Sequence, residues 1–408
     1  MSSNPRVLMI VTLDTKAQEA QFLRETLERH GVEVVHMDPS IRREVEGGAR
    51  ITPAQIAAAA GKTLQQVRDL KHEGKCLGVM IEGAIRCALD EHKRAPLAGI
   101  VGIGGSMGSA LSSAVMQAFP YGLPKVIVST MASGMTSAFV GAKDIAMFNS
   151  VCDIAGLNSI IRDVLRNAAI AVAAMAQAYS PVRAEARPLI AMGTLGTTDG
   201  CTVRVRKALE AQGYEVMVFH TQGAGGAALD QIVNERDVTA VVDTSIVEHN
   251  DFLNNGLFNA GPDRSRAALK KGIPVIFAAG NADFMVGGPI EQARLQFPGK
   301  RYHMHNHAVT AVRTEAEELH KLARHIGKLV AEDATGPVSF FIPLQGFSHH
   351  DSPDGHLHDP SLCPVFAQAV RQAMPAGVQV REFDCHINDA PFADAIVQQV
   401  LAYTDARR

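Results

Sequence analysis

Residues 97–118 have the sequence LAGIVGIGGSMGSALSSAVMQA. The apolar run at 97–101 predicts a buried strand, several glycines follow it, and an Ala- and Ser-rich helix is expected from about Ser109. A strand, a glycine turn and a helix in this order present backbone N–H groups and a helix N-terminus to an anion. Glycine has no Cβ, so phosphate oxygens can approach the backbone closely. This loop is therefore a candidate phosphate-binding loop.

The loop matches neither of the two common phosphate-binding patterns. Met107 stands where G-x-G-x-x-G has its third glycine, and no Lys follows as in G-x-x-x-x-G-K-[ST]. A tight strand-to-helix turn with close packing is the alternative interpretation. The residues predicted to face a ligand here are Gly104, Gly105, Ser106, Met107, Gly108 and Ser109.

Composition restricts the classes of function. The chain has 408 residues, enough for two or three domains, and its net charge of -3 provides no basic field for nucleic acid. Its six cysteines form no C-x-x-C pair, which is typical of reduced thiols in a cytoplasmic protein. The first residues show no signal-peptide pattern, and no window of 18 apolar residues occurs. We expect a cytoplasmic protein without a membrane or nucleic-acid partner.

Strand and helix patterns alternate along the whole chain, and the pattern restarts after residues 179–188. The sequence predicts an N-terminal α/β domain at 1–178, a linker at 179–188 and a C-terminal α/β domain at 189–408. When Gly31 is aligned with Gly213, residues 12–15 (TLDT) fall on residues 194–197 (TLGT). The expected fold class is α/β, with two Rossmann-like domains whose mainly parallel sheets are flanked by helices. A further short strand is expected at 77–81.

Other candidate ligand residues follow predicted strands, where open α/β sheets bind their ligands. Lys16 could neutralise a phosphate or could be an ordinary solvated lysine. The residues predicted to bind a cofactor at these strand ends are Thr12, Asp14, Thr15 and Lys16, then Thr130, Ser133 and Gly134.

The second half contains a G-x-G-x-x-A match at 223–228, with Asp243 at a suitable distance. The match follows the second strand of its domain, whereas the dinucleotide fingerprint belongs to the first strand-to-helix turn. NAD is therefore the less favoured interpretation.

Ten of the sixteen histidines lie beyond residue 300. In residues 302–307 (YHMHNH) they alternate, and a strand would place all three on one face, suitable for Zn²⁺ or general acid–base chemistry. The predicted catalytic groups are His305, His386 and Asp389. The alternative is loop histidines that cap turns and face water, and whether a metal binds stays open because no compact metal signature occurs.

The chain resembles the tomato mosaic virus resistance protein-like ATP-binding family over nearly its whole length. The resemblance rests on the motifs VTLDTK (11–16), GIGGSMGSA (102–110), STMASG (129–134), FHTQGAGG (219–226), AGPDR (260–264), HNH (305–307), GFSHHDSPDG (346–355) and DCHINDAPFA (384–393). Membership implies two Rossmann-like domains, ATP-type nucleotide binding and assembly as a dimer, but no established reaction. It also implies that residues 104–109 face the nucleotide, with Thr130, Ser133 and Gly134 nearby.

The chain departs from the family pattern in its second domain. Residues 196–198 are Gly-Thr-Thr where the family has Gly-Val-Thr, and His307 stands where a proline usually follows His-Asn. The loop that begins at Asp243 also continues differently. These departures make a different ligand in the second domain plausible.

The combined expectation is an ATP-binding protein, with Mg²⁺ as a candidate companion ion and the ligand at strand carboxyl ends facing the cleft between domains. A homo-dimer or higher homo-oligomer is expected. One alternative is a metal- or His-dependent metabolic enzyme that acts on a small phosphorylated or carboxylated compound. Another is a non-catalytic regulatory binding module. Whether the protein is an enzyme stays open.

Overall fold

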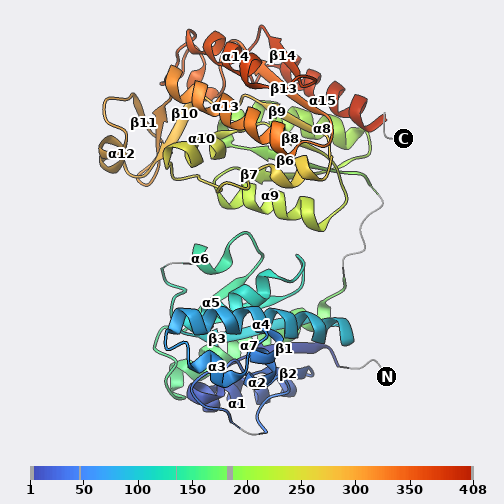
Figure 1. The fold of residues 1–408 in the computed structure, drawn as a ribbon, viewed down its shortest axis with the longest axis vertical. Helices are drawn as coiled ribbons and strands as arrows, with labels where there is room; N and C mark the ends of the chain where they lie inside the picture. Colours follow the sequence, from blue (N-terminus) through green and yellow to red (C-terminus); the bar gives the residue numbers. More distant parts are fainter. Residues whose placement is uncertain (1–3, 46, 135, 182–186, 406–408) are drawn as a thin grey trace. The chain divides into compact units, whose positions relative to one another are not determined.

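A computed structural model describes residues 4–45, 47–134, 136–181 and 187–405 (Figure 1). The chain forms two compact units, Met1–Arg183 and Ala184–Arg408. Each unit is an α/β domain with a parallel sheet flanked by helices, so the predicted fold class is confirmed. Half of the predicted linker at 179–188, namely residues 182–186, lies outside the described residues.

The first sheet has the strand order β2-β1-β3-β4-β5, and all its strands are parallel. Its strands are β1 (Arg6–Ile10), β2 (Glu33–Met37), β3 (Gly99–Gly104), β4 (Lys125–Ser129) and β5 (Ala146–Asn149). β1 lies between β2 and β3. The connection from β1 to β2 therefore covers one face of the sheet, and the connection from β2 to β3 covers the other face. The carboxyl ends of β1 and β3 are therefore the topological switch point, where such sheets bind ligands.

Helices cover both faces of this sheet. Alternate residues of β1 show why: Leu8 and Ile10 belong to one apolar cluster, whereas Val7 and Met9 belong to the other. The first cluster is completed by α2 (Pro53–Ala59), α3 (Leu64–Arg68), α4 (Glu73–Arg94) and α5 (Ser106–Gln117). The second is completed by α1 (Leu13–Arg29) and α7 (Ser159–Ala178), and a short helix α6 (Ser137–Val140) follows β4.

The strand expected at 77–81 is wrong, because these residues lie inside α4. Cys76, Met80, Ala84 and Ala88 are buried at intervals of four, which is the periodicity of a helix with one face on the core. A short apolar run does not distinguish a strand from part of a buried helix, since both are apolar over five residues.

The second sheet has the order β14-β13-β9-β8-β6-β7 and is also parallel. Its strands are β6 (Leu189–Thr194), β7 (Glu215–His220), β8 (Val238–Asp243), β9 (Val275–Ala278), β13 (Val338–Pro343) and β14 (Gln379–Phe383). β6 lies between β7 and β8, just as β1 lies between β2 and β3. The two aligned segments, 12–15 and 194–197, both connect the central first strand of their sheet to the helix that follows, which supports the predicted repeat.

Two helix groups cover the second sheet (Figure 1). The group formed by α8 (Asp199–Ala211) and α15 (Ala390–Asp405) packs on one face. The other group consists of α9 (Ala224–Glu235), α10 (Val247–Asn254), α11 (Arg266–Lys270), α13 (Ala316–Asp333) and α14 (Leu362–Ala373). In the described residues, no helix is long and apolar enough to cross a membrane.

An antiparallel sheet is inserted between β9 and β13, with the order β10-β12-β11. It consists of β10 (Phe284–Gly287), α12 (Ile290–Gln296), β11 (Tyr302–Met304) and β12 (Thr310–Arg313). Because β11 ends at Met304, His305 and His307 lie in the following turn. The expectation that all three alternating histidines share one strand face is therefore wrong.

Replacing Gly104 by Ala tests the packing of α5 against β3. The new Cβ would lie 2.7 Å from the Gly108 Cα, so we expect a destabilisation of about 1–3 kcal/mol. At Gly105 the nearest atom to a new Cβ is the Thr130 Oγ1, at 3.7 Å, and Gly105→Ala is the matched control with an expected cost below about 1 kcal/mol. Urea unfolding of the full chain, followed by circular dichroism, measures both. Equal unfolding midpoints for the two variants would contradict the packing argument.

Candidate functional site

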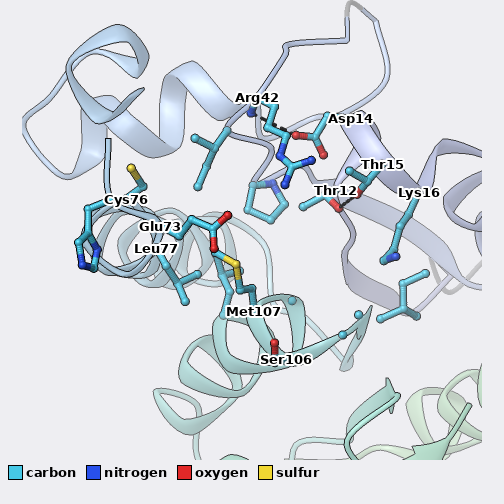
Figure 2. Close-up of a pocket in the computed structure, with 18 of the residues that line it drawn as sticks. Thr12, Asp14, Thr15, Lys16, Arg42, Glu73, Cys76, Leu77, Ser106 and Met107 are labelled. Carbon is cyan, nitrogen blue, oxygen red and sulfur yellow. Dashed lines mark hydrogen bonds between the residues drawn. The ribbon is translucent and has the colours of Figure 1, made fainter. Parts of the chain in front are cut away.

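A cavity of about 460 Å³ opens at the carboxyl ends of β1 and β3, at the switch point of the first sheet (Figure 2). Loops that follow β1, β2 and β3 line it together with the turn before α4. Among its lining residues are Thr12, Asp14, Thr15 and Lys16 after β1, and Gly104, Gly105, Ser106, Met107 and Gly108 after β3. The structure thus brings these two predicted groups, far apart in the sequence, to one cavity.

The glycines of the loop have two different roles. A Cβ at Gly102 would lie 2.3 Å from the Ser112 Oγ, and one at Gly104 would meet the backbone of Gly108. Without a Cβ at these two positions, α5 packs closely on β3. This is the tight strand-to-helix turn that the sequence permitted as the alternative interpretation of the loop. Gly105 is different, because a Cβ there has room within the protein. The packing of α5 on β3 therefore does not require a glycine at this position. The missing side chain instead leaves free space at the cavity.

The N-terminus of α5 lies at this cavity without a counter-charge of its own. Gly105 is its N-cap residue, no side chain caps the helix, and its first turn holds no acidic residue. The first N–H groups of a helix have no partner within it, and the helix dipole places partial positive charge there. Ser106 and Met107 of this first turn line the cavity. The arrangement is suited to an anion.

Three cationic side chains, Lys16, Arg42 and Lys71, line the cavity with two carboxylates, Asp14 and Glu73. Lys16 Nζ donates to the Ile154 carbonyl at 2.7 Å, which leaves two further N–H groups on the ammonium. The backbone N–H of Arg42 donates to Asp14 Oδ2 at 3.2 Å and fixes the loop after β2 beside α1. Figure 2 shows Arg42 and Asp14 together on one side of the cavity and Ser106 and Met107 on the other.

Four of the predicted cofactor residues, Ser109, Thr130, Ser133 and Gly134, are not in the lining of the cavity. The N–H of Thr130 donates to the Gly104 carbonyl at 3.3 Å, and Ser133 and Gly134 belong to the same loop after β4. Ser109 is fully buried, with its Oγ 2.6 Å from the Ser129 Oγ. That hydroxyl joins α5 to β4.

Sequence reasoning missed Arg42, Lys71, His72, Glu73 and Cys76 as lining residues. Arg42 follows β2 by five residues, so the order of the strands could have pointed to it. Lys71 has a φ of 46°, in the left-handed region that non-glycine residues rarely adopt. No sequence signal marks that conformation.

A second cavity, of about 510 Å³, lies at the carboxyl ends of β6 and β7 in the other domain. Leu195, Gly196 and Thr197 after β6 line it, as do His220 and Gln222 at the end of β7. Phe258, in the loop after α10, also lines it. The inserted sheet with its turns and the 3-10 turn η2 (His349–Asp351) supply the remaining lining residues, which are Phe284, Val286, His305, Asn306, Val309, Ala311, His349 and His350.

Histidines gather beside this second cavity. The ring centroids of His303 and His356 are 4.4 Å apart and stacked, and those of His303 and His350 are 4.6 Å apart. Burial, together with the neighbouring imidazoles, lowers the pKa of His350 to about 4. No group of three or more His, Cys, Asp or Glu in the described part of the chain is arranged to hold a metal ion.

The three predicted catalytic residues are not brought to one place. His305 lines the second cavity, whereas His386 and Asp389 form the turn before α15. His386 Nε2 lies 2.9 Å from the Ser348 carbonyl oxygen, and Asn388 N donates to His386 Nδ1 at 3.1 Å. Asp389 accepts the backbone N–H of His386 at 2.8 Å. Both ring nitrogens of His386 thus have partners that hold this turn.

The glycine loop at 223–228 binds a carboxylate of its own chain. Glu248 Oε1 accepts the N–H groups of Gly223 and Gly226 at 2.7 and 3.0 Å. Its other oxygen, Oε2, accepts from Arg264 Nε at 2.7 Å. Because an internal anion occupies these amides, the loop is not open to the pyrophosphate of a dinucleotide. The less favoured NAD interpretation is thereby excluded for this loop.

Arg264 is the centre of a buried ionic cluster. Its Nη2 lies 2.6 Å from Asp243 Oδ2, and its Nη1 lies 3.7 Å from Asp230 Oδ2. Burial raises the pKa of Asp243 and Glu248, while the Arg264 guanidinium opposes the increase. The cluster joins the ends of β7 and β8 to α10, so it positions the loop that carries His220 and Gln222.

Two family models match this chain in succession. The N-terminal domain of the Uncharacterised protein family (UPF0261) matches residues 5–181, and the C-terminal domain of the same family matches residues 187–404. The chain belongs to the UPF0261 family. A UPF0261 protein of Clostridium tetani is 34% identical over 403 residues, which cover 98% of each chain.

More distant relatives extend the family to plants. A UPF0261 protein of Brucella suis is 32% identical over 96% of this chain and 94% of its own length. The ToMV resistance protein Tm-1(GCR237) of Solanum lycopersicum is 30% identical over the whole of this chain, which spans 57% of that protein. Among solved structures, a pyrethroid hydrolase PytH aligns with a TM-score of 0.27 and 13% identity over 55% of this chain and 100% of its own. That likeness is too low to carry an argument.

Glu248→Ala is expected to destabilise the second domain by about 3–5 kcal/mol, because it removes one carboxylate from the buried ionic cluster and leaves Arg264 Nε and two glycine amides without a partner. The exposed pair Arg294–Glu291, at 3.4 Å, provides the matched control in the same domain. Glu291→Ala is expected to change the stability by less than about 1 kcal/mol. Thermal unfolding of the full chain compares the two. A Glu248→Ala variant as stable as Glu291→Ala would contradict the role of the cluster.

Proposed function

We propose that the first domain of this UPF0261 protein binds ATP, with Mg²⁺ as the companion ion. The observation that carries the proposal is the cavity at the switch point of the first sheet, where an uncapped helix N-terminus meets three cationic side chains. A triphosphate needs both backbone donors and positive charge, and this cavity offers both. The resemblance to an ATP-binding family, whose motifs include residues 11–16 and 102–110, supports the same ligand.

The lining residues fit the parts of such a ligand. The first turn of α5 and the space beside Gly105 would hold phosphate oxygens, and Lys16, Arg42 and Lys71 would neutralise their charge. Ile41, Leu77 and Leu111 provide apolar surface for the base. Asp14 and Glu73 supply the carboxylate oxygens that Mg²⁺ prefers. When bound, Mg²⁺ would neutralise charge on the phosphates.

We further propose that the protein acts in the cytoplasm and as a homo-oligomer. The six free cysteines support a reducing compartment, and the family resemblance supports the assembly. Nucleotide binding is compatible with two functions, catalysis and regulation, which are distinguished by whether the bound ATP is turned over. Turnover of bound ATP would assign an ATP-using enzyme, whereas stoichiometric binding without turnover would assign a regulatory module.

Lys16→Met is expected to weaken ATP binding about 10- to 100-fold, because it removes a charge from the cavity and retains the length of the side chain. Calorimetry on the full chain, with and without Mg²⁺, measures the affinity, and the recovered nucleotide is analysed for hydrolysis. Lys93→Met is the matched control, since Lys93 lies at the exposed end of α4 with 77% of its side chain accessible.

Gly105→Ala is a second variant that should weaken ATP binding by steric hindrance, whereas Lys16→Met removes a charge. The new Cβ is tolerated by the protein but would occupy the space expected for phosphate oxygens, and we expect about tenfold weaker binding. Unchanged affinity in both Lys16→Met and Gly105→Ala, with the fold intact, would refute this site. Absence of ATP binding by the unmodified protein would refute the ligand.

A further inference from the structure

The histidine-lined cavity of the second domain is independent of the proposed nucleotide site. We propose that this cavity binds a small organic carboxylate with an apolar body, such as an aromatic or branched aliphatic acid, whose carboxylate bonds to His350. It lies at the carboxyl ends of the neighbouring parallel strands β6 and β7, the edge of an open α/β sheet at which ligands bind. Its volume of about 510 Å³ lies within the range of small-molecule sites.

The wall of the cavity is apolar. Leu195, Phe284, Val286 and Ala311 belong to one apolar cluster, against which Phe258 and Val309 pack. All six also line the cavity. Phe284, Val286 and Ala311 come from the inserted sheet, so the insertion builds a surface on which a ring or branched chain can be buried.

The polar groups that line the cavity differ from those of the first domain. They are hydroxyl, amide and imidazole groups, and the described lining residues include no Lys, Arg, Asp or Glu. A phosphate ester carries up to two negative charges and usually binds to Arg, Lys or a metal ion. A carboxylate carries one negative charge, which a single imidazolium can balance. The lining thus favours a carboxylate over a phosphate.

His350 is the central polar group. Its side chain and backbone together are only 8% exposed, and its ring packs edge-on against Phe284 with the centroids 5.6 Å apart. Within the described structure, its ring nitrogens make no hydrogen bond, although the residue lines the cavity. The ring nitrogens are not among the buried atoms of the described residues that lack a partner, so they are open to the cavity, where a ligand oxygen can bond to them.

Protonation of His350 links ligand binding to pH. The titratable groups that face it are His303, His305, His349 and His356, and with burial they hold it neutral at pH 7. A carboxylate beside the ring favours the imidazolium and raises its pKa. Ligand binding therefore takes up a proton between pH 7.5 and 6.0. The dissociation constant should fall as the pH falls, by up to about tenfold per pH unit.

Calorimetry on the full chain with phenylacetate and with 4-methylpentanoate, at pH 7.5 and 6.0, tests the proposal. We expect both acids to bind more tightly at pH 6.0, and the uncharged analogue phenylacetamide to bind weakly with no dependence on pH. His350→Gln is expected to abolish the pH dependence. His307→Gln, an exposed histidine outside the lining, is the matched control and should behave like the unmodified protein.

Gly196→Val blocks the cavity by another route. A Cβ at Gly196 has no heavy atom within 4 Å, so the added side chain has room to enter the cavity, and we expect it to abolish binding of both acids. Thermal unfolding checks that this variant is folded, and His350→Gln provides the test if it is not. The measurements use no nucleotide, so their outcome is independent of the ATP proposal.

Three results would overturn the assignment. The first is no binding of either acid at pH 6.0, and the second is equal affinity for the acid and the amide at both pH values. The third is one equivalent of Zn²⁺ recovered with the purified protein and lost in His350→Gln, which would assign a metal centre in place of a carboxylate site.

Discussion

Both domains depend on one constraint, which is that the first strand of each parallel sheet is hydrogen-bonded on both edges by strands that follow it. β1 pairs with β2 and β3, and β6 pairs with β7 and β8. All strands point in one direction, so the loops after them meet at one edge. Because the chain proceeds to opposite sides of the first strand, those loops diverge there. The first cavity lies where they diverge, and the second lies next to the equivalent place, at the ends of β6 and β7.

The two domains use this shared arrangement differently. The first domain places a helix N-terminus, three cationic side chains and two carboxylates at the divergence. The second domain adds an antiparallel sheet and covers the carboxyl ends of β6 and β7 with aromatic, aliphatic and imidazole groups. An ionic cluster around Arg264 then holds the loops of that domain. One fold thus offers two chemically distinct environments within a single chain.

Much of this arrangement could be predicted from the sequence. Apolar runs followed by glycine turns indicated the parallel strands, and those strands place residues 12–16 and 104–108 at one sheet edge. The inserted sheet was not predicted, because its three strands are only three or four residues long. Lys71 and Glu73 reach the first cavity through a turn whose path depends on tertiary packing. The partners of Ser109 and His386 likewise depend on contacts distant in sequence.

The carboxylate of Glu248 at the second glycine loop has a consequence for assigning function by sequence motifs. The loop at 223–228 matches a dinucleotide fingerprint, yet its amides are occupied from within. The loop at 104–108 matches no standard pattern, yet it borders an open cavity. A motif search would therefore select a loop whose N–H groups already have a partner within the chain. A better criterion is whether an acidic side chain of the same protein already accepts the loop's N–H groups, and that criterion can be applied wherever a related fold is known.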